Sequence, residues 1–202
     1  MPALAWLAVA YLLGSVPSAL IAGRWLKGID LRQFGSGNLG ATNVYRVLGA
    51  RAAVAVLSFD IAKGVVPVLF FPRWTTGAAA AWWPIAYGVA AIVGHIRPVY
   101  LGGRGGGKGV ATATGVFVAL APMPMVLAIA VWLAVVSLTR YVSLASVTAA
   151  LSLPFAVAVW YGAGDWLVPG AAAVGAFVVW THRANLFRLS RGIEPRIGRP
   201  GQ

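Results

Sequence analysis

The stretch VATATGVFVALAPMPMVLAIAVWLAVVSL, residues 110–138, decides the fold class of this chain. It contains no charged side chain, and its 29 residues exceed the roughly 20 that an α-helix needs to cross a bilayer. Pro122 and Pro124 interrupt the middle of the stretch, where proline stops or kinks a helix. The stretch is therefore typical of a membrane protein, and it is too long for one simple span.

The rest of the chain has the same character. Of the 202 residues, 60% are hydrophobic and only 10% are charged, which leaves too little polar surface for a soluble globule. None of the apolar stretches shows the period-2 alternation of a barrel strand, so we expect an all-α integral membrane protein. No repeat or appended domain is evident, which predicts a single transmembrane domain over residues 1–202. The apolar stretches cover residues 3–23, 52–72, 82–101, 110–138, 143–161 and 164–181.

Positive charge sets the predicted topology. The basic residues gather between the apolar stretches, and the positive-inside rule asks that these clusters share the cytoplasmic side. Six simple spans would place Arg140 and the C-terminal tail outside, whereas two short spans divided near Pro122–Pro124 give seven spans with all four clusters inside. Each half would have about 12 to 15 residues, or roughly 20 Å of helix. One long, kinked helix is the competing interpretation. The clusters are Arg24–Arg51, Arg97–Lys108, Arg140 and Arg183–Arg199, and only Lys63 and Arg73 lie elsewhere.

The first apolar stretch lacks the basic start and the small-residue cleavage site of a signal peptide, so we expect it to remain as a span. Cysteine is absent, which excludes disulfides and thiolate chemistry, and we expect neither a metal nor a cofactor. The net charge of +12 favours an anionic partner. Because membrane embedding argues against nucleic acid, anionic membrane lipids and a phosphorylated substrate remain.

Residues 30–49, DLRQFGSGNLGATNVYRVLG, form a polar segment with the composition of an anion site. Glycines at 35, 37 and 40 allow backbone amides to converge on a phosphate, and Arg46 adds a guanidinium fork. An alternative, compatible interpretation is a turn that caps a short helix over residues 39–48, with Asn38 as the capping residue. The neutral donors of the segment are Ser36, Asn38, Thr42 and Asn43.

Residues 94–114, GHIRPVYLGGRGGGKGVATAT, form a second glycine-rich loop that opens a span. Glycines 105 to 107 expose amides, Arg104 and Lys108 supply charge, and the next helix would point its N-terminus at a bound anion. Gly109 follows Lys108, so the Ser or Thr of a nucleotide-binding P-loop is absent and a nucleotide hydrolase is disfavoured. A flexible hinge is the alternative. His95 is expected to orient this loop.

Two weaker segments follow. In RYVSLAS, residues 140–146, Ser143 and Ser146 stand one turn apart and could face one pocket, although such pairs also serve helix packing. In THRANLFRLSRGIEP, residues 181–195, His182 and Asn185 could share a helical face. Asp60 lies three residues before Lys63 inside a span, where the two can pair. The tail arginines, which are Arg188, Arg191, Arg196 and Arg199, could simply hold anionic headgroups.

Taken together, GSGNLGATN followed by Arg46, GHIRPVYLGGRGGGKGVAT, YVSLAS and HRANLFRLSRGIE resemble, in this order, the PlsY-type acyl-phosphate:glycerol-3-phosphate acyltransferases of bacterial membranes. The resemblance covers nearly the whole chain. It implies seven spans in the bacterial plasma (inner) membrane and an active site at the cytoplasmic face. The implied reaction moves a fatty acyl group from acyl phosphate to the C1 hydroxyl of glycerol 3-phosphate, which gives lysophosphatidic acid and inorganic phosphate. We expect a monomer.

The resemblance also implies residue roles. The predicted topology brings Ser143 and His182 to the same side of the membrane as Arg46 and Lys108. Glu194 matches a glutamate thought to be structural. The implied catalytic residues are Ser36, Lys108, His182 and Asn185, and the implied substrate- or phosphate-binding residues are Gly37, Asn38, Asn43, Arg46, Arg104, Gly105, Gly106, Gly107 and Ser143.

The chain departs from the family pattern at two places. Similar proteins usually have Gly-Phe-Lys-Gly-Gly-Lys in the second motif, so Arg104 takes the place of that lysine and one glycine is added. Ala184 stands where a glutamate is usual. The general base is either His182 or a phosphate oxygen of the substrate, and no acyl-enzyme on Ser36 is required.

Two other classes of protein fit part of the pattern. A transporter for a small phosphorylated solute would gather cations, but it should also show inverted repeats, which are not seen. A lipid-binding structural protein would need the basic tail but not the segment around residues 35–43.

Overall fold

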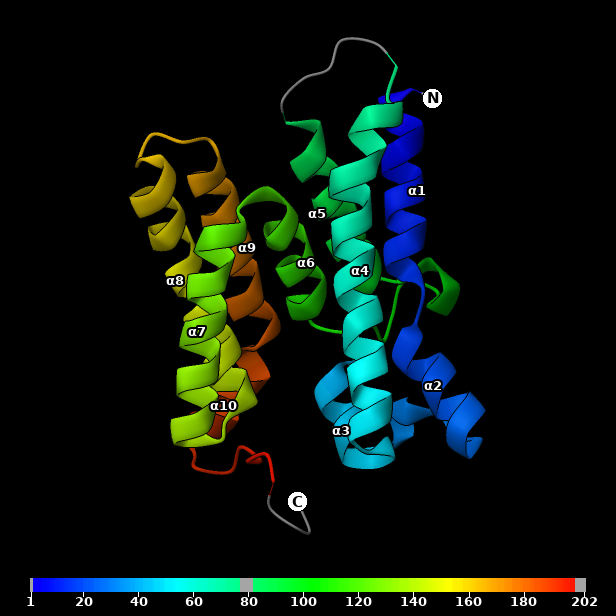
Figure 1. The fold of residues 1–202 in the computed structure, drawn as a ribbon. Coiled ribbons are helices and arrows are strands. Elements are labelled where there is room, and N and C mark those ends of the chain that lie inside the picture. The colour runs from blue at the N-terminus through cyan, green and yellow to red at the C-terminus, as the bar shows by residue number, and fades with distance from the viewer. Residues whose placement is uncertain (1, 77–81, 199–202) are drawn as a thin grey trace. The chain divides into compact units, whose positions relative to one another are not determined.

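The computed structural model describes residues 2–76 and 82–198, and over these residues the chain is helical, with one isolated β-bridge between Pro2 and Thr76 and no strand (Figure 1). Two short 3-10 turns, η1 (Leu31–Gln33) and η2 (Val99–Leu101), lie in the polar segments. The α-helices are α1 (Ala3–Ser15), α2 (Ser18–Lys27), α3 (Ala41–Leu48), α4 (Ala50–Trp74), α5 (Trp83–Ile96), α6 (Val110–Leu120), α7 (Pro122–Thr139), α8 (Val142–Tyr161), α9 (Leu167–Thr181) and α10 (Arg183–Ser190).

Four helical segments within the described ranges are long and apolar enough to cross a membrane. Helices α6 and α9 are shorter and also apolar. The prediction of an all-α, multi-span membrane protein is therefore confirmed, while the count of seven spans and the cytoplasmic side of the loops stay predictions. The four segments are Ala3–Lys27, Ala50–Trp74, Pro122–Thr139 and Val142–Tyr161.

The stretch 110–138 is interrupted where its prolines predicted. Helix α6 ends at Leu120 and α7 begins at Pro122, and between them Ala121 has non-helical angles, with φ −144° and ψ 68°. Proline is well suited to a helix start because its missing N–H would have no partner there. One long, kinked helix is therefore wrong. The two halves are also less equal than expected, with 11 and 18 residues.

The first apolar stretch, which was expected to form one span, is broken as well. Helix α1 ends at Ser15 and α2 begins at Ser18, so Val16 and Pro17 have non-helical backbone. Pro17 lacks the N–H that would continue the helical ladder, and its ring crowds the preceding turn. At the break, the Val16 carbonyl accepts from the Ser18 amide at 3.0 Å and can accept a further bond from another helix.

The chain folds as two compact units, unit 1 (Met1–Leu120) and unit 2 (Ala121–Gln202). A single domain over residues 1–202 stays a prediction. In unit 1, α1 packs on α5, and α4 packs on both α5 and α6, so that these helices lie side by side (Figure 1). Helices α2 and α3 lie at the end of α4 that is remote from the N-terminus (Figure 1). In unit 2, α8 packs between α7 and α9, and α10 follows α9.

Glycines bring the helix backbones of unit 1 into direct contact. A Cβ on Gly14 of α1 would collide with the Ala91 carbonyl of α5, and a Cβ on Gly94 of α5 would collide with the Tyr11 carbonyl of α1. Helices α4 and α6 show the same reciprocity: Gly64 faces the Thr112 carbonyl and Gly115 faces the Ile61 carbonyl. Such close approach is a common way of joining helices in lipid, where burying apolar side chains gives no advantage.

We expect Gly64→Ala to lower the free energy of unfolding by about 1–3 kcal/mol, because the added methyl group meets backbone that cannot rotate away. Thermal unfolding in detergent would show this as a midpoint lowered by roughly 3–10 °C. Gly164→Ala is the matched control, since a Cβ there meets nothing within 4 Å. Equal midpoints for the two variants would show that α4 and α6 do not need this contact.

Within each unit, basic clusters that are far apart in the sequence lie close together. In unit 1, a Cβ on Gly105 would lie 3.3 Å from Cδ of Arg32, so the clusters Arg24–Arg51 and Arg97–Lys108 meet at one end, whereas Arg73 lies in the last turn of α4 at the other end. In unit 2, the Ile197 amide donates to the Arg140 carbonyl at 2.9 Å, which joins the tail to the α7–α8 turn. Arg199 lies outside the described residues.

Candidate functional site

The first glycine-rich loop is shaped by Asn43, which is buried in α3. Its Oδ1 accepts a hydrogen bond from the Ser36 amide at 2.9 Å, and its Nδ2 donates to the carbonyls of Leu31 and Phe34 at 3.3 and 3.1 Å. A Cβ on Gly35 would collide with the Asn43 Oδ1. The Asn43 amide thus supports the loop from beneath, and its contact with a phosphate stays a prediction.

Ser36 is exposed at the tip of this loop, between two glycines with left-handed backbone, Gly35 at φ 59° and Gly37 at φ 69°. Helix α3 starts after Gly40, and no side chain caps it, so the expected cap by Asn38 is wrong. Arg46 lies half-buried in the last turn of α3. The loop therefore presents a hydroxyl group and backbone amides a few residues before a cation.

The other arginine of the loop is neutralised locally. Arg32 donates to both carboxylate oxygens of Asp30, with Nη2 2.6 Å from Oδ2. The hydrogen bonds from the Arg32 side chain and amide lower the pKa of Asp30 to about 2, and the pair raises the pKa of Arg32. Asp30 therefore stays ionised throughout the physiological range, and the phosphate contact of Arg46 stays a prediction.

The second loop runs from the end of α5 to the start of α6. The Gly107 amide donates to the His95 carbonyl at 3.1 Å, and Arg97 donates to the Gly103 carbonyl at 3.4 Å. Arg104 is exposed, and Lys108 is half-buried two residues before α6 begins. This arrangement of glycine amides, a lysine and a helix N-terminus is suited to an anion.

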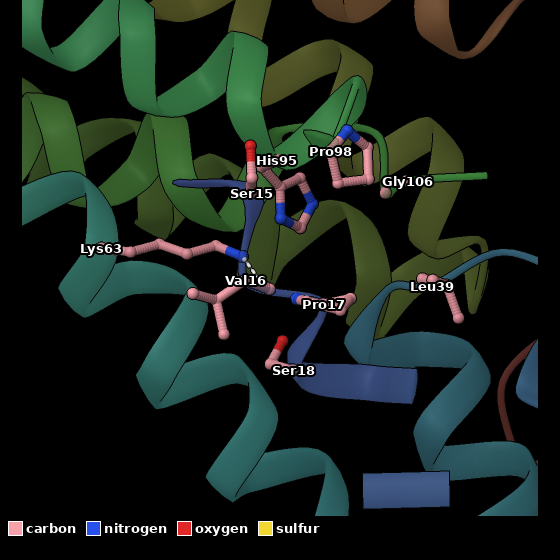
Figure 2. Close-up of a pocket in the computed structure, with 10 residues that line it drawn as sticks. Ser15, Val16, Pro17, Ser18, Leu39, Lys63, His95, Pro98 and Gly106 are labelled. Carbon is pink, nitrogen blue, oxygen red and sulfur yellow. Dashed lines mark hydrogen bonds between the residues drawn. The ribbon is translucent and has the colours of Figure 1, made fainter. Parts of the chain in front are cut away.

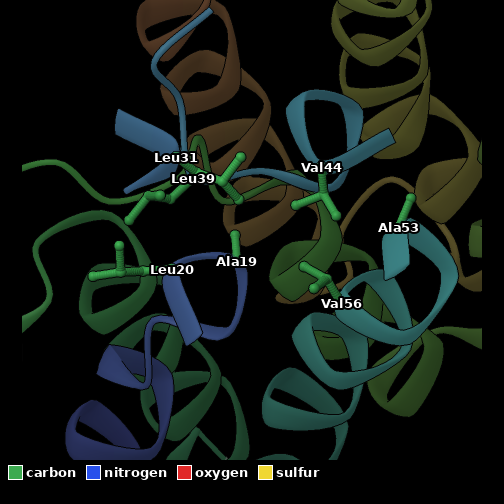
Figure 3. Close-up of a cluster of buried hydrophobic side chains, with 7 residues drawn as sticks. All are labelled: Ala19, Leu20, Leu31, Leu39, Val44, Ala53 and Val56. Atoms are coloured by element: carbon green, nitrogen blue, oxygen red, sulfur yellow. The ribbon is translucent and has the colours of Figure 1, made fainter. Parts of the chain in front are cut away.

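The two loops come together within unit 1. Leu31 and Leu39 of the first loop enter a buried apolar cluster, and Leu101 of the second loop packs against it. Figure 3 shows the buried side chains of this cluster pointing toward one another from α2, the first loop, α3 and α4. The predicted phosphate-binding segments are thus neighbours. The cluster consists of Ala19, Leu20, Leu31, Leu39, Val44, Ala53 and Val56.

A small cavity of about 10 Å³, with room for about one water molecule, lies beneath the loops. Leu39 of the first loop and Gly106 and Gly107 of the second line it, together with Lys63 and His95 (Figure 2). Residues at the break between α1 and α2 complete the lining.

A buried ion pair adjoins this cavity, as the spacing of Asp60 and Lys63 predicted. Lys63 Nζ lies 2.8 Å from Asp60 Oδ1 and also donates to the Val16 carbonyl at 3.1 Å, a bond drawn in Figure 2. Ser18 Oγ donates to the same Asp60 oxygen at 2.7 Å. His95 Nδ1 is 3.8 Å from it, and the His95 ring leaves no room for a Cβ on Gly107.

In unit 2, the carboxylate of Glu194 accepts hydrogen bonds from two of the predicted site residues, Ser143 and Asn185. Glu194 Oε1 accepts from Ser143 Oγ at 2.8 Å and from Asn185 Nδ2 at 2.6 Å, and Oε2 accepts from Arg188 Nε at 2.7 Å. Ser143, Asn185 and Glu194 are buried. The tail is thereby fastened to α8 and α10, and two of the expected residues are brought together.

His182 and Ser146 lie differently. His182 is buried where α9 meets α10, with its Nδ1 2.9 Å from the Val178 carbonyl. Because a carbonyl only accepts, Nδ1 carries the proton. Ser146 donates to the Val142 carbonyl and accepts from Trp132, so it does not share the carboxylate that Ser143 binds. The expectation of one pocket for both serines is not met by these bonds.

We expect the stability contributed by Glu194 to depend on pH. Burial of the carboxylate acts to raise its pKa, but the hydrogen bonds from Asn185, Ser143 and Arg188 outweigh burial and hold the pKa below the ordinary 4.5. A lowered pKa means that the stabilisation is complete above about 4.5 and is lost as the pH falls through the folded-state value.

Glu194→Gln should therefore unfold about 2 kcal/mol more easily than the parent at pH 7, the scale of a hydrogen bond to a charged group. This difference should shrink as the pH is lowered below 4.5, because the parent becomes neutral too. Unfolding midpoints of both proteins in detergent between pH 3 and 8 give the measurement. A difference that stays constant over this range would contradict the role of the charge.

The sequence reasoning missed the contribution of Val16 and Ser18. The signal that could have revealed it is Pro17, a proline inside an apolar stretch whose neighbouring backbone groups need new partners. Among the described residues, no group of three or more His, Cys, Asp or Glu side chains could hold a metal ion.

Comparison with known proteins gives one family. The sequence profile described as glycerol-3-phosphate acyltransferase matches residues 4–192. A glycerol-3-phosphate acyltransferase of Parasynechococcus marenigrum is 45% identical over 98% of this chain and 91% of its own length. One from Prochlorococcus marinus is 49% identical over 95% and 93%.

The similar solved structures belong to the same family as the sequence relatives. The integral membrane glycerol 3-phosphate acyltransferase PlsY (YgiH), in its glycerol 3-phosphate form, is 40% identical, with a TM-score of 0.86 over 97% of this chain and 96% of the solved chain. The same protein in its lysophosphatidic acid form gives the same score over 97% and 95%.

Proposed function

The chain belongs to the glycerol-3-phosphate acyltransferase family, and we propose that it transfers a fatty acyl group from an acyl phosphate to the C1 hydroxyl of glycerol 3-phosphate. The products would be lysophosphatidic acid and inorganic phosphate. Family membership favours this reaction over the transporter and the structural lipid-binding protein. The observation that carries the proposal is the pairing of two glycine-rich loops, with Arg46 and Lys108, in one unit of a membrane protein.

The chemistry of the loops suits two phosphorylated substrates. An acyl phosphate is already activated, so the reaction requires charge neutralisation and positioning more than a protein nucleophile. We assign Arg46 and Lys108 to the phosphates, with Ser36 and the backbone amides of the loops as neutral donors. Arg104 is exposed on the second loop and would meet a phosphate entering from solvent. The amides assigned to phosphate binding are those of Asn38, Gly105 and Gly106, because the amides of Gly37 and Gly107 donate to the carbonyls of Phe34 and His95 and shape the loops instead.

Unit 2 also holds residues that the family resemblance assigns to the reaction. Glu194 orients Ser143 and Asn185, which fixes the directions of their remaining donors and acceptors. His182 holds its proton on Nδ1 against the Val178 carbonyl, so its basic nitrogen is Nε2. In the reaction, the C1 oxygen forms the new ester bond, the acyl–phosphate bond breaks, and the hydroxyl proton passes to His182 Nε2 or to a phosphate oxygen.

The active site would face the cytoplasm of a bacterial inner membrane, since the basic clusters of each unit gather at one end and the positive-inside rule places such clusters there. The fatty chain would lie among the apolar helices. We propose that the protein acts as a monomer.

An assay with purified protein in detergent tests the reaction. Labelled glycerol 3-phosphate would be supplied with acyl phosphate or, in a parallel arm, with acyl-CoA. We expect labelled lysophosphatidic acid and one inorganic phosphate per acyl group from the first arm only. Product in the acyl-CoA arm but not in the acyl-phosphate arm would overturn the donor assignment. The absence of product in both arms would contradict the proposed reaction.

The base is tested with His182→Ala in the same assay. If His182 takes the proton, turnover should fall by roughly 10²- to 10⁴-fold, the usual contribution of a general base. A variant with near-parental turnover would assign the proton to the substrate phosphate instead.

A further inference from the structure

We propose that the buried Asp60–Lys63 ion pair is a positioning pair for the phosphate site: it fixes the second glycine-rich loop against the first. The inference rests on the proposed function and deepens it. Neither residue lies on a loop. Both belong to the middle of α4, where the chain is otherwise apolar.

The burial of this pair requires an explanation beyond stability. The side chains of Asp60 and Lys63 are 1% and 2% exposed. Transfer of two charges from water costs several kcal/mol per ion, and replacing a buried pair by uncharged residues of similar volume is often neutral or stabilising. Charged residues inside a span are usually tied to function for the same reason.

The pair first fixes the break between α1 and α2. Lys63 Nζ donates to the Val16 carbonyl, which also accepts from the Ser18 amide, and Ser18 Oγ donates to Asp60 Oδ1. Lys63 and Asp60 therefore bind the residues directly before and after Pro17, which are Val16 and Ser18. Helix α2 in turn supplies Ala19 and Leu20 to the apolar cluster that carries Leu31 and Leu39 of the first loop.

The pair also reaches the second loop through His95. The His95 Nδ1 lies 3.8 Å from Asp60 Oδ1, and the ring lies directly against Gly107, where there is no space for a Cβ. The His95 carbonyl accepts the Gly107 amide. A displacement of Asp60 would therefore be transmitted to Gly107, and Lys108 is the next residue.

The common cavity joins these contacts. The cavity of about 10 Å³ is lined by Lys63, His95, Leu39 of the first loop and Gly107 of the second. Both loops therefore meet Lys63 and His95 around one small space. Asp60 and Lys63 act through their neighbours, so they are positioning residues, and their loss should weaken phosphate binding.

The test uses the double variant Asp60→Asn/Lys63→Met, because each single change would leave one buried charge without its partner. We expect the double variant to fold, with an unfolding midpoint within a few degrees of the parent. Its KM for glycerol 3-phosphate should rise about 10-fold or more, since displaced binding groups can cost up to 10²-fold. Asp165→Asn is the matched control, because this carboxylate bonds the Leu167 amide in unit 2.

A second measurement makes the test independent of acyl transfer. Inorganic phosphate should raise the unfolding midpoint of the parent and of Asp165→Asn, and it should raise that of the double variant much less. If the parent binds phosphate but makes no lysophosphatidic acid, the proposed function fails while this comparison still decides the inference.

Two outcomes would overturn the positioning role. One is a double variant with parental KM and parental stabilisation by phosphate. The other is a variant with less active protein but unchanged KM and unchanged phosphate stabilisation, which is the result expected of a purely structural pair.

Discussion

Lys108→Met is expected to lower kcat/KM for acyl transfer roughly 10²- to 10³-fold, or about 3–4 kcal/mol of transition-state stabilisation. The lysine lies half-buried between Gly107 and Gly109, two residues before α6 begins. There its charge and the helix N-terminus would act on the same phosphate. In the proposed reaction, the leaving phosphate gains negative charge as the acyl–phosphate bond breaks, and methionine cannot compensate for it. Initial rates over a range of both substrates give the measurement.

Lys27→Met is the matched control for this change. Lys27 also belongs to unit 1 and lies at the end of α2, but it is exposed and donates to the Val47 carbonyl at 2.7 Å. The same loss of charge there should alter kcat/KM by less than about 3-fold, the scale of a surface interaction. A similar loss of kcat/KM in Lys108→Met and Lys27→Met would mean that activity depends on the overall positive charge and that Lys108 does not act on the phosphate directly.

Gly106→Ala is expected to lower kcat/KM about 10²-fold, because the added methyl group displaces the second glycine-rich loop as a whole. A Cβ at this position would collide with the carbonyl oxygens of both His95 and Ile96. These are backbone atoms at the end of α5 and cannot rotate away, so the loop has to yield. A displacement of about 1 Å at a positioning element is enough for a loss of this size. Steady-state rates and unfolding midpoints should be measured together.

The comparison of stability with activity separates displacement from unfolding. Gly106→Ala should retain most of its unfolding midpoint, because the loop is only partly buried and α5 itself is unchanged. Gly164→Ala, at an open position of unit 2, should retain both stability and rate. A fully active Gly106→Ala protein would show that the loop tolerates displacement and does not present its amides to phosphate.

Hydropathy and charge were sufficient to predict the helical membrane fold from the sequence. They also located the interruption at Pro122, because two prolines in a stretch of 29 residues leave few alternatives. The break at Pro17 was not foreseen. Its stretch has the length of a single span, and nothing in the local pattern shows that Lys63, 47 residues away, binds the freed carbonyl.

The site was predictable in composition and less so in its internal bonds. The motifs identified both glycine-rich loops, and the structure brings them together. The role of Asn43 as a support depends on bonds to Leu31, Phe34 and Ser36, which only the folded loop defines. Likewise, Ser143 and Ser146 stand one turn apart, but Glu194 binds one and Trp132 the other.

The glycine contacts between helices have a consequence for the route of lipids. Where Gly14 meets Ala91 and Gly64 meets Thr112, the backbones touch, and no gap remains for an alkyl chain to slip through from the bilayer. A fatty substrate or product cannot pass sideways through the α1–α5 seam or the α4–α6 seam at these levels. An alkyl chain that enters or leaves unit 1 must therefore pass between other helices, because these two helix pairs are closed to it.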